Sequence, residues 1–251
     1  MTSKLLSITG LTSALLLAAS VQAAPVIFFG ENQAPAQRST GAPATARADL
    51  VGNLSGGVGT ETFEAQTAGN GAPLVISFPG SGGAITATIS GDGQVFQSSS
   101  RGRFNTTGAG AAPVSGKWWE ASSTFEITFS SAVSAFGFYG TDVGDFDGQV
   151  TVALTDTNNF VTNLTVPNTR NATDGSLLFW GFLDTATAYT KISFGNTSTA
   201  GPDVDVFGFD DMIVGDLRQI VPPGGVPEPA SLALVGLALL GGAAARRFAK
   251  R

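Results

Sequence analysis

Between residues 60 and 216, apolar and polar residues alternate in short segments separated by turns rich in Gly, Asp and Asn. In one segment, Phe125, Ile127 and Phe129 alternate with polar residues. A period of two places the apolar side chains on one face of a strand, whereas an amphipathic helix repeats them every three or four residues. About eleven such segments occur without a long helical period between them. The sequence therefore predicts an all-β fold, an antiparallel β-sandwich or jelly-roll-like domain.

The expected strands share this alternation or form a short apolar run between turns. They are Leu74–Phe78, Ala84–Ser90, Gln94–Gln97, Phe125–Phe129, Val133–Tyr139, Val150–Leu154, Phe160–Val166, Leu177–Leu183, Tyr189–Phe194, Val204–Phe209 and Met212–Val214. Residues 24–59 are rich in Ala, Pro, Gly and Thr, which predicts a low-complexity lead-in with a short helix at Ala44–Leu54. The β-sandwich domain is expected over 60–216, and a Pro/Gly linker over 217–225.

The composition excludes several kinds of chemistry. The 251 residues include no Cys and no His. Disulfides, thiol nucleophiles, thiolate zinc sites and catalytic triads with His are therefore excluded. The sequence also lacks a nucleophile elbow, a P-loop and a dinucleotide fingerprint. We expect a protein that is not an enzyme. An acidic-residue glycoside hydrolase is the weakest alternative, and its carboxylates would come from Glu61, Glu64, Glu120 and Glu126.

The N-terminus has the pattern of a secretory signal peptide over residues 1–23. Lys4 supplies a positive start, Leu5–Ala19 is largely apolar, and Val21-Gln22-Ala23 presents short residues before the expected cleavage point. A membrane anchor is the alternative, but the apolar run is short and no stop-transfer pattern follows it. This segment predicts export and removal by signal peptidase.

The C-terminus carries a second signal. The sequence Pro227-Glu228-Pro229 precedes the uncharged run Ala230–Ala245. As a helix this run would span about 24 Å, slightly less than a hydrocarbon core of about 30 Å. Four cations follow it: Arg246, Arg247, Lys250 and Arg251. We expect a single transmembrane helix with these cations on the cytoplasmic side. A plain tail anchor without further processing is the alternative.

This arrangement over residues 226–251 resembles the PEP-CTERM sorting signal of Gram-negative bacteria. The resemblance implies a protein that is exported, anchored transiently in the inner membrane and processed by exosortase. It also implies that Pro227, Glu228 and Pro229 are the recognition element. Cleavage near them would pass the protein to the cell surface or the extracellular matrix.

The exported part also resembles the extracellular β-domain often found upstream of this signal. The matching stretches are Phe136–Phe146 and Phe207–Asp211, and the resemblance brings no established activity. Without both ends, residues 24–225 keep eight cations and eighteen acidic residues, a net charge of −10. Such a charge argues against nucleic acid and anionic membrane surfaces as partners.

Two acidic clusters predict a calcium site. The candidate ligands are Asp142, Asp145 and Asp147 in a Gly-containing loop, together with Asp210 and Asp211. Calcium binds six to eight oxygens, and carboxylates close in sequence can supply several of them. The alternative is that these residues only form turns, in which Asp side chains accept hydrogen bonds from nearby amides.

The Trp118-Trp119 pair predicts a glycan platform, because adjacent strand residues face opposite sides and one ring would then be exposed. Core packing is the commoner fate of Trp, and Trp180, within an apolar run, is expected in the core. The sequence thus favours a structural or adhesive matrix protein. The alternative is a calcium-dependent module that binds exopolysaccharide.

Overall fold

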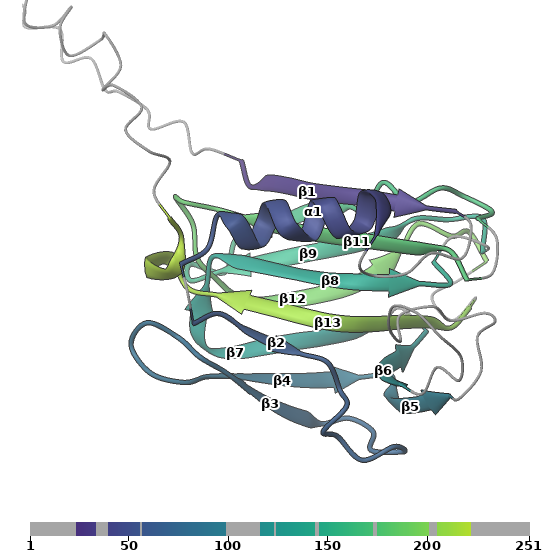
Figure 1. Ribbon diagram of the computed structural model, residues 1–251, viewed down its shortest axis with the longest axis horizontal. Coiled ribbons are helices and arrows are strands. Elements are labelled where there is room, and N and C mark those ends of the chain that lie inside the picture. Colours follow the sequence, from purple (N-terminus) through teal and green to yellow (C-terminus); the bar gives the residue numbers. More distant parts are fainter. Residues whose placement is uncertain are drawn as a thin grey trace, which may run out of the picture.

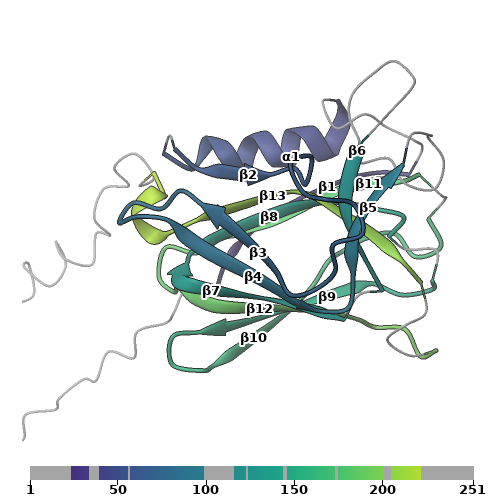
Figure 2. The same cartoon turned by 90° about the horizontal axis from the view of Figure 1, so that it is seen from below.

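The alternating segments form two antiparallel sheets that pack face to face, with one helix on the outer face of one sheet (Figures 1 and 2). The computed structural model describes residues 24–33, 40–55, 57–98, 116–122, 124–143, 146–172, 175–200 and 205–221. The signal peptide and the C-terminal signal expected from the sequence lie outside these residues. Within them, no helix is long and apolar enough to cross a membrane.

The seven-stranded sheet has the order β1-β11-β8-β13-β6-β5, and β2 pairs with β13. Its strands are β1 (Val26–Asn32), β2 (Gly59–Glu61), β5 (Gln94–Ser98), β6 (Gly116–Ala121), β8 (Ala135–Thr141), β11 (Leu177–Leu183) and β13 (Phe207–Gly215).

The six-stranded sheet has the order β10-β9-β12-β7-β4-β3. Its strands are β3 (Leu74–Phe78), β4 (Ile85–Gly91), β7 (Phe125–Val133), β9 (Val150–Asp156), β10 (Val161–Thr165) and β12 (Tyr189–Asn196). The antiparallel sandwich predicted from the sequence is confirmed.

Aromatic side chains fill the space between the sheets. Phe125 of β7 stacks on Phe194 of β12, with ring centroids 4.3 Å apart and an interplanar angle of 11°. Phe209 of β13 meets Phe125 edge to face from the opposite sheet at 4.9 Å. Trp180 is fully buried in the same core, as the sequence predicts. Aromatic contacts of this kind contribute about 0.5–1.5 kcal/mol each beyond their buried area.

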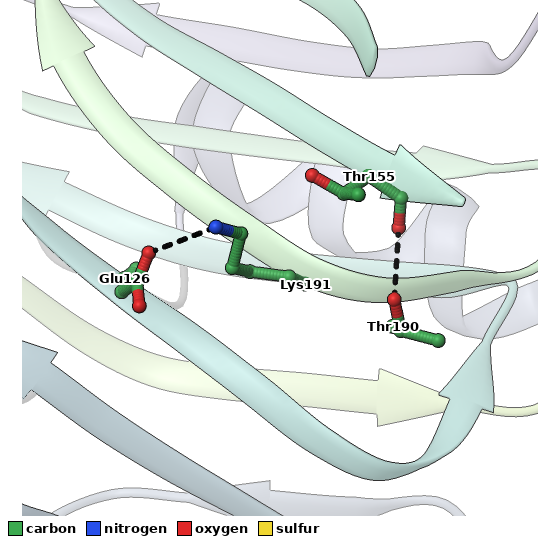
Figure 3. A network of polar contacts seen from close by, with 4 residues as sticks. All are labelled: Glu126, Thr155, Thr190 and Lys191. Carbon is green, nitrogen blue, oxygen red and sulfur yellow. Dashed lines mark hydrogen bonds and ion pairs between the residues drawn. The ribbon is translucent and has the colours of Figure 1, made fainter. Parts of the chain in front are cut away.

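The outer face of the six-stranded sheet is polar. Across it, Thr128 of β7, Lys191 of β12 and Thr155 of β9 lie in one row of the register. Lys191 forms an ion pair with Glu126 at 3.2 Å, and the hydroxyl of Thr190 donates to the Thr155 carbonyl at 3.4 Å (Figure 3). Because this ion pair is solvent-exposed, its contribution to stability is small, about 0–1 kcal/mol.

The outer face of the seven-stranded sheet is covered by α1 (Gly41–Gly52), which lies over β1, β11 and β8. Leu50 of α1 is fully buried against two glycines that pair across β8 and β11, Gly137 and Gly181. A Cβ atom added to Gly137 or Gly181 would lie 2.7 or 2.8 Å from Cδ2 of Leu50. The two glycines therefore form the slot that lets the helix approach the sheet.

Residues 24–33 and 40–55 are a structured part of the domain, which corrects the expected lead-in. β1 pairs with β11 along its whole length, and α1 packs on the sheet. The short helix predicted at Ala44–Leu54 is confirmed, but it begins three residues earlier, at Gly41, and ends at Gly52. β1, β2 and β6 were not among the strands listed from the sequence, and β13 replaces two expected strands because a bulge at Asp210–Ile213 joins them. The expected linker begins with a 3₁₀ helix, η1 (Leu217–Gln219).

The two ends of the domain leave the sandwich at the same side. Val26 pairs with Leu183, Leu183 with Ala135, and Ala135 with Gly215, so both ends lie in one row across four strands. Three strand spacings of about 4.8 Å place them about 14 Å apart. The exit is fixed, because the Val221 amide donates to the Asn53 carbonyl at 2.9 Å. Figure 1 shows β5 and β6 toward the opposite end.

Candidate functional site

The acidic residues proposed as calcium ligands differ in their local structure. Asp142 follows β8 and is buried, whereas Asp147 is exposed. Both have positive φ angles, +60° and +55°, which Asp tolerates better than most residues. Asp145 lies outside the described residues. Across the described ranges, no group of three acidic side chains lies close enough to hold a metal ion.

The other two candidates lie at the bulge of β13: Asp210 is the last paired residue before it, and Asp211 lies within it. Asp210 is fully buried, and its Oδ1 accepts a hydrogen bond from the Asp211 amide at 2.7 Å. Asp211 has a φ of +49°, so the bulge turns the strand at this position. Asp210 therefore has a local role in the bulge, whatever else it binds.

Both members of the tryptophan pair are buried, which corrects the expectation that one ring is exposed. Trp119 points into the core between the sheets and is 0% exposed. Trp118 points to the outer face, as the alternation requires, but is only 1% exposed. The ring of Phe96 from the adjacent strand β5 packs on it, with centroids 5.4 Å apart. Neither Trp presents a face to a sugar.

Phe96 is the exposed aromatic residue of this region, at 37% of its surface. It lies in a depression of about 550 Å³, which we call the Phe96 depression. Its lining residues are Ala68, Gly69, Gln94, Val95, Phe96 and Gln97. Sequence reasoning missed Phe96, although Val95 and Phe96 lie in an expected strand and the alternation places them on opposite faces.

A second depression of about 340 Å³, the Asp92 depression, shares Gln94 with the first. It is lined by Gly71, Asp92, Gly93, Gln94, Glu120, Ala121, Ser122 and Val206. Oδ2 of Asp92 accepts hydrogen bonds from the Ser122 hydroxyl at 2.6 Å and the Ser122 amide at 2.8 Å. These bonds lower the pKa of Asp92, so its carboxylate stays ionised.

The four glutamates considered for hydrolysis lie in different environments. Glu61 accepts a hydrogen bond from the Gln66 side chain, and Glu64 accepts one from the Lys117 amide at 3.1 Å. Glu126 pairs with Lys191 on the outer face of the other sheet. Of the four, Glu120 alone lines one of these two depressions. A glycosidase acid needs a raised pKa, and the pKa of the neighbouring Asp92 is lowered instead.

The chain leaves the domain at Val221, and the family comparison concerns the segment that follows. The family model described as the PEP-CTERM protein-sorting motif matches residues 225–247. The chain carries a PEP-CTERM sorting motif. This confirms the resemblance drawn from the sequence and marks an exported, membrane-processed cell-surface protein whose processing enzyme is exosortase. The match includes Pro227, Glu228 and Pro229.

Of the expected membrane-flanking cations, Arg246 and Arg247 fall within the PEP-CTERM match, whereas Lys250 and Arg251 follow it. All four, with the Pro-Glu-Pro element, lie outside the described residues. No curated protein matches the sequence.

Several solved structures match parts of the chain, with TM-scores below 0.5. The K2 cleaved adhesin domain of Lys-gingipain is 15% identical, with a TM-score of 0.36, over 62% of this chain and 97% of that chain. The C-terminal family 22 carbohydrate-binding module of Clostridium thermocellum Xyn10B is 10% identical, with a TM-score of 0.29, over 66% of this chain and 98% of that chain. TmCBM61 in complex with β-1,4-galactotriose is 14% identical, with a TM-score of 0.24, over 51% of this chain and 86% of that chain. Likenesses at this level carry no inference about what this chain binds.

Proposed function

We propose that this is a surface or extracellular-matrix protein of a Gram-negative bacterium, with a non-catalytic β-domain that has a structural or adhesive role. The sorting motif at residues 225–247 carries this proposal. Signal peptidase would remove residues 1–23 during export. The apolar helix would then hold the protein in the inner membrane until exosortase cleaves near Pro227-Glu228-Pro229.

The arrangement of the domain is consistent with such tethering. Both ends leave at one side of the sandwich, and the C-terminal exit is bonded to the end of α1. While the C-terminal helix is in the membrane, that side would face the bilayer. The opposite end, with the Phe96 and Asp92 depressions, would then face away from the membrane.

A calcium ion bound by Asp142, Asp145, Asp147, Asp210 and Asp211 is also a proposal, and it rests on the density of carboxylates in the sequence. The buried positions of Asp142 and Asp210 limit it, because those carboxylates would need access to the ion. The ion would stabilise the end of the sandwich without taking part in a reaction.

The sorting proposal is tested by the intact mass of the mature protein from its native host. We expect the wild-type chain to end near Pro229 and the double variant Pro227→Ala/Pro229→Ala to keep the segment up to Arg251. The matched control is Pro222→Ala/Pro223→Ala, which removes the same number of prolines from the adjacent linker and should be processed normally. A wild-type mature chain that still ends at Arg251 would refute processing.

A further inference from the structure

The exposed ring of Phe96 is held in place from beneath. Its partner Trp118 is 1% exposed, and the two rings meet at an angle of 47°. β5 is fixed on its other edge as well, because the Gly69 amide donates to the Val95 carbonyl at 2.7 Å. The Val95 amide donates in turn to the Asn70 carbonyl at 2.8 Å. The ring is therefore preorganised for a ligand.

Small and amide side chains surround this ring. Ala68 and Gly69 leave space on one side, and the depression has the volume of an ordinary small-molecule site. Gln94 contributes a side-chain amide, which both donates and accepts hydrogen bonds. Gln94 lies on the same face of the sheet as Phe96, since they alternate with the buried Val95.

The adjacent Asp92 depression extends this surface with acceptor groups. Its carboxylates belong to Asp92 and Glu120, and the hydroxyl of Ser122 lies beside them. None of the described residues that line either depression is Lys or Arg. Residues 24–225 also have a net charge of −10, so an anionic ligand would be repelled.

We propose that the Phe96 and Asp92 depressions together bind a neutral oligosaccharide chain. The face of Phe96 would pack on the C–H face of one sugar ring, as aromatic side chains do with flat apolar surfaces. The Gln94 amide would bond its hydroxyls, and the carboxylates of Asp92 and Glu120 would accept hydrogen bonds from the next sugar. This inference deepens the proposed function, on which it rests, by naming a ligand class for the adhesive role.

The test measures binding of the full-length chain, kept in a detergent without sugar head groups, by isothermal titration calorimetry. The probes are hexasaccharides of β-1,4-linked glucose, xylose and mannose. We expect at least one of them to bind, and Phe96→Ala to weaken that binding by about tenfold or more, which corresponds to about 1.4 kcal/mol. Phe96→Tyr keeps the ring and should keep most of the affinity.

The matched control is Phe160→Ala, which removes another exposed ring, 74% accessible, beside β10 of the other sheet. It should bind as the wild type does. Binding of none of the three probes, or equal binding by Phe96→Ala and wild type, would overturn the proposal. Release of shorter sugars would overturn the non-catalytic role. Because binding is measured on the uncleaved chain, failure of exosortase processing would leave this result unchanged.

Discussion

The slot formed by Gly137 and Gly181 makes a quantitative prediction about how α1 is held on the sheet. Leu50→Ala removes a fully buried side chain and should lower the free energy of unfolding by about 2–5 kcal/mol. Gly137→Ala places a Cβ atom 2.7 Å from Cδ2 of Leu50 and 2.7 Å from Cζ of Phe179. Overpacking of this kind costs about 1–3 kcal/mol.

The two changes should not be additive. In the double variant Leu50→Ala/Gly137→Ala, the added methyl group occupies part of the space that the leucine leaves. The double variant should therefore be more stable than the sum of the single losses implies, by at least about 1 kcal/mol. The contact with Phe179 remains, so the recovery is partial.

Gly181→Ala provides the matched control. Its Cβ atom would also lie 2.8 Å from Cδ2 of Leu50, but it would lie 2.8 Å from the backbone oxygen of Phe136 as well. Shortening Leu50 cannot relieve a backbone contact, so coupling with Leu50→Ala should be smaller. Urea unfolding of residues 24–225, with the m-value unchanged, measures the free energy of unfolding of the three single variants and of the two double variants that contain Leu50→Ala. If the losses in free energy of unfolding of Leu50→Ala and Gly137→Ala simply add in the double variant, the proposed packing of Leu50 against Gly137 is wrong.

Two further predictions concern ionisation and metal binding. Tyr189 is buried and donates to Oδ2 of Asp184 at 2.7 Å, and burial together with this bond raises its pKa. Stability is therefore retained below about pH 10, where an unfolded tyrosine begins to ionise, and falls above it by up to about 1.4 kcal/mol per pH unit. Tyr189→Phe should flatten this dependence in urea unfolding, and an unchanged slope would contradict the assignment. Calcium at a hundredfold excess over its dissociation constant should add about 2.7 kcal/mol, a rise of several degrees in Tm relative to EDTA. Equal Tm values in Asp145→Asn with and without calcium would support the site, and no shift in the wild type would leave the aspartates as turn residues.

The sandwich was predictable because several strands alternate between the buried and the solvent-facing side of a sheet. In β9 and in the first six residues of β7 the burial alternates residue by residue, so the pattern and the structure coincide. β1 has no such alternation, and its place in the sheet depends on partners about 150 residues later, in β11. A pairing between segments so far apart cannot be recognised from the residues around β1 alone.

The candidate site was less predictable than the fold. Alternation correctly places Trp118 and Trp119 on opposite faces, but it cannot tell whether an outer face is covered. Here Phe96 from the neighbouring strand takes the exposed position, and Trp118 becomes its support. The sorting motif, by contrast, was legible because its recognition depends on the order of residues along the chain rather than on a folded surface.

The position of β13 has a mechanical consequence for a tethered protein. This strand has β8 on one side and β6 and β2 on the other, and it ends at the side where the chain leaves for the membrane. A pull on the tether would first load the hydrogen bond between Val221 and Asn53; beyond it, a pull along the strand axis would reach β13. Its hydrogen bonds would then bear the load together, in shear, instead of opening one after another. The domain would thus be tethered through a strand that is paired on both of its edges.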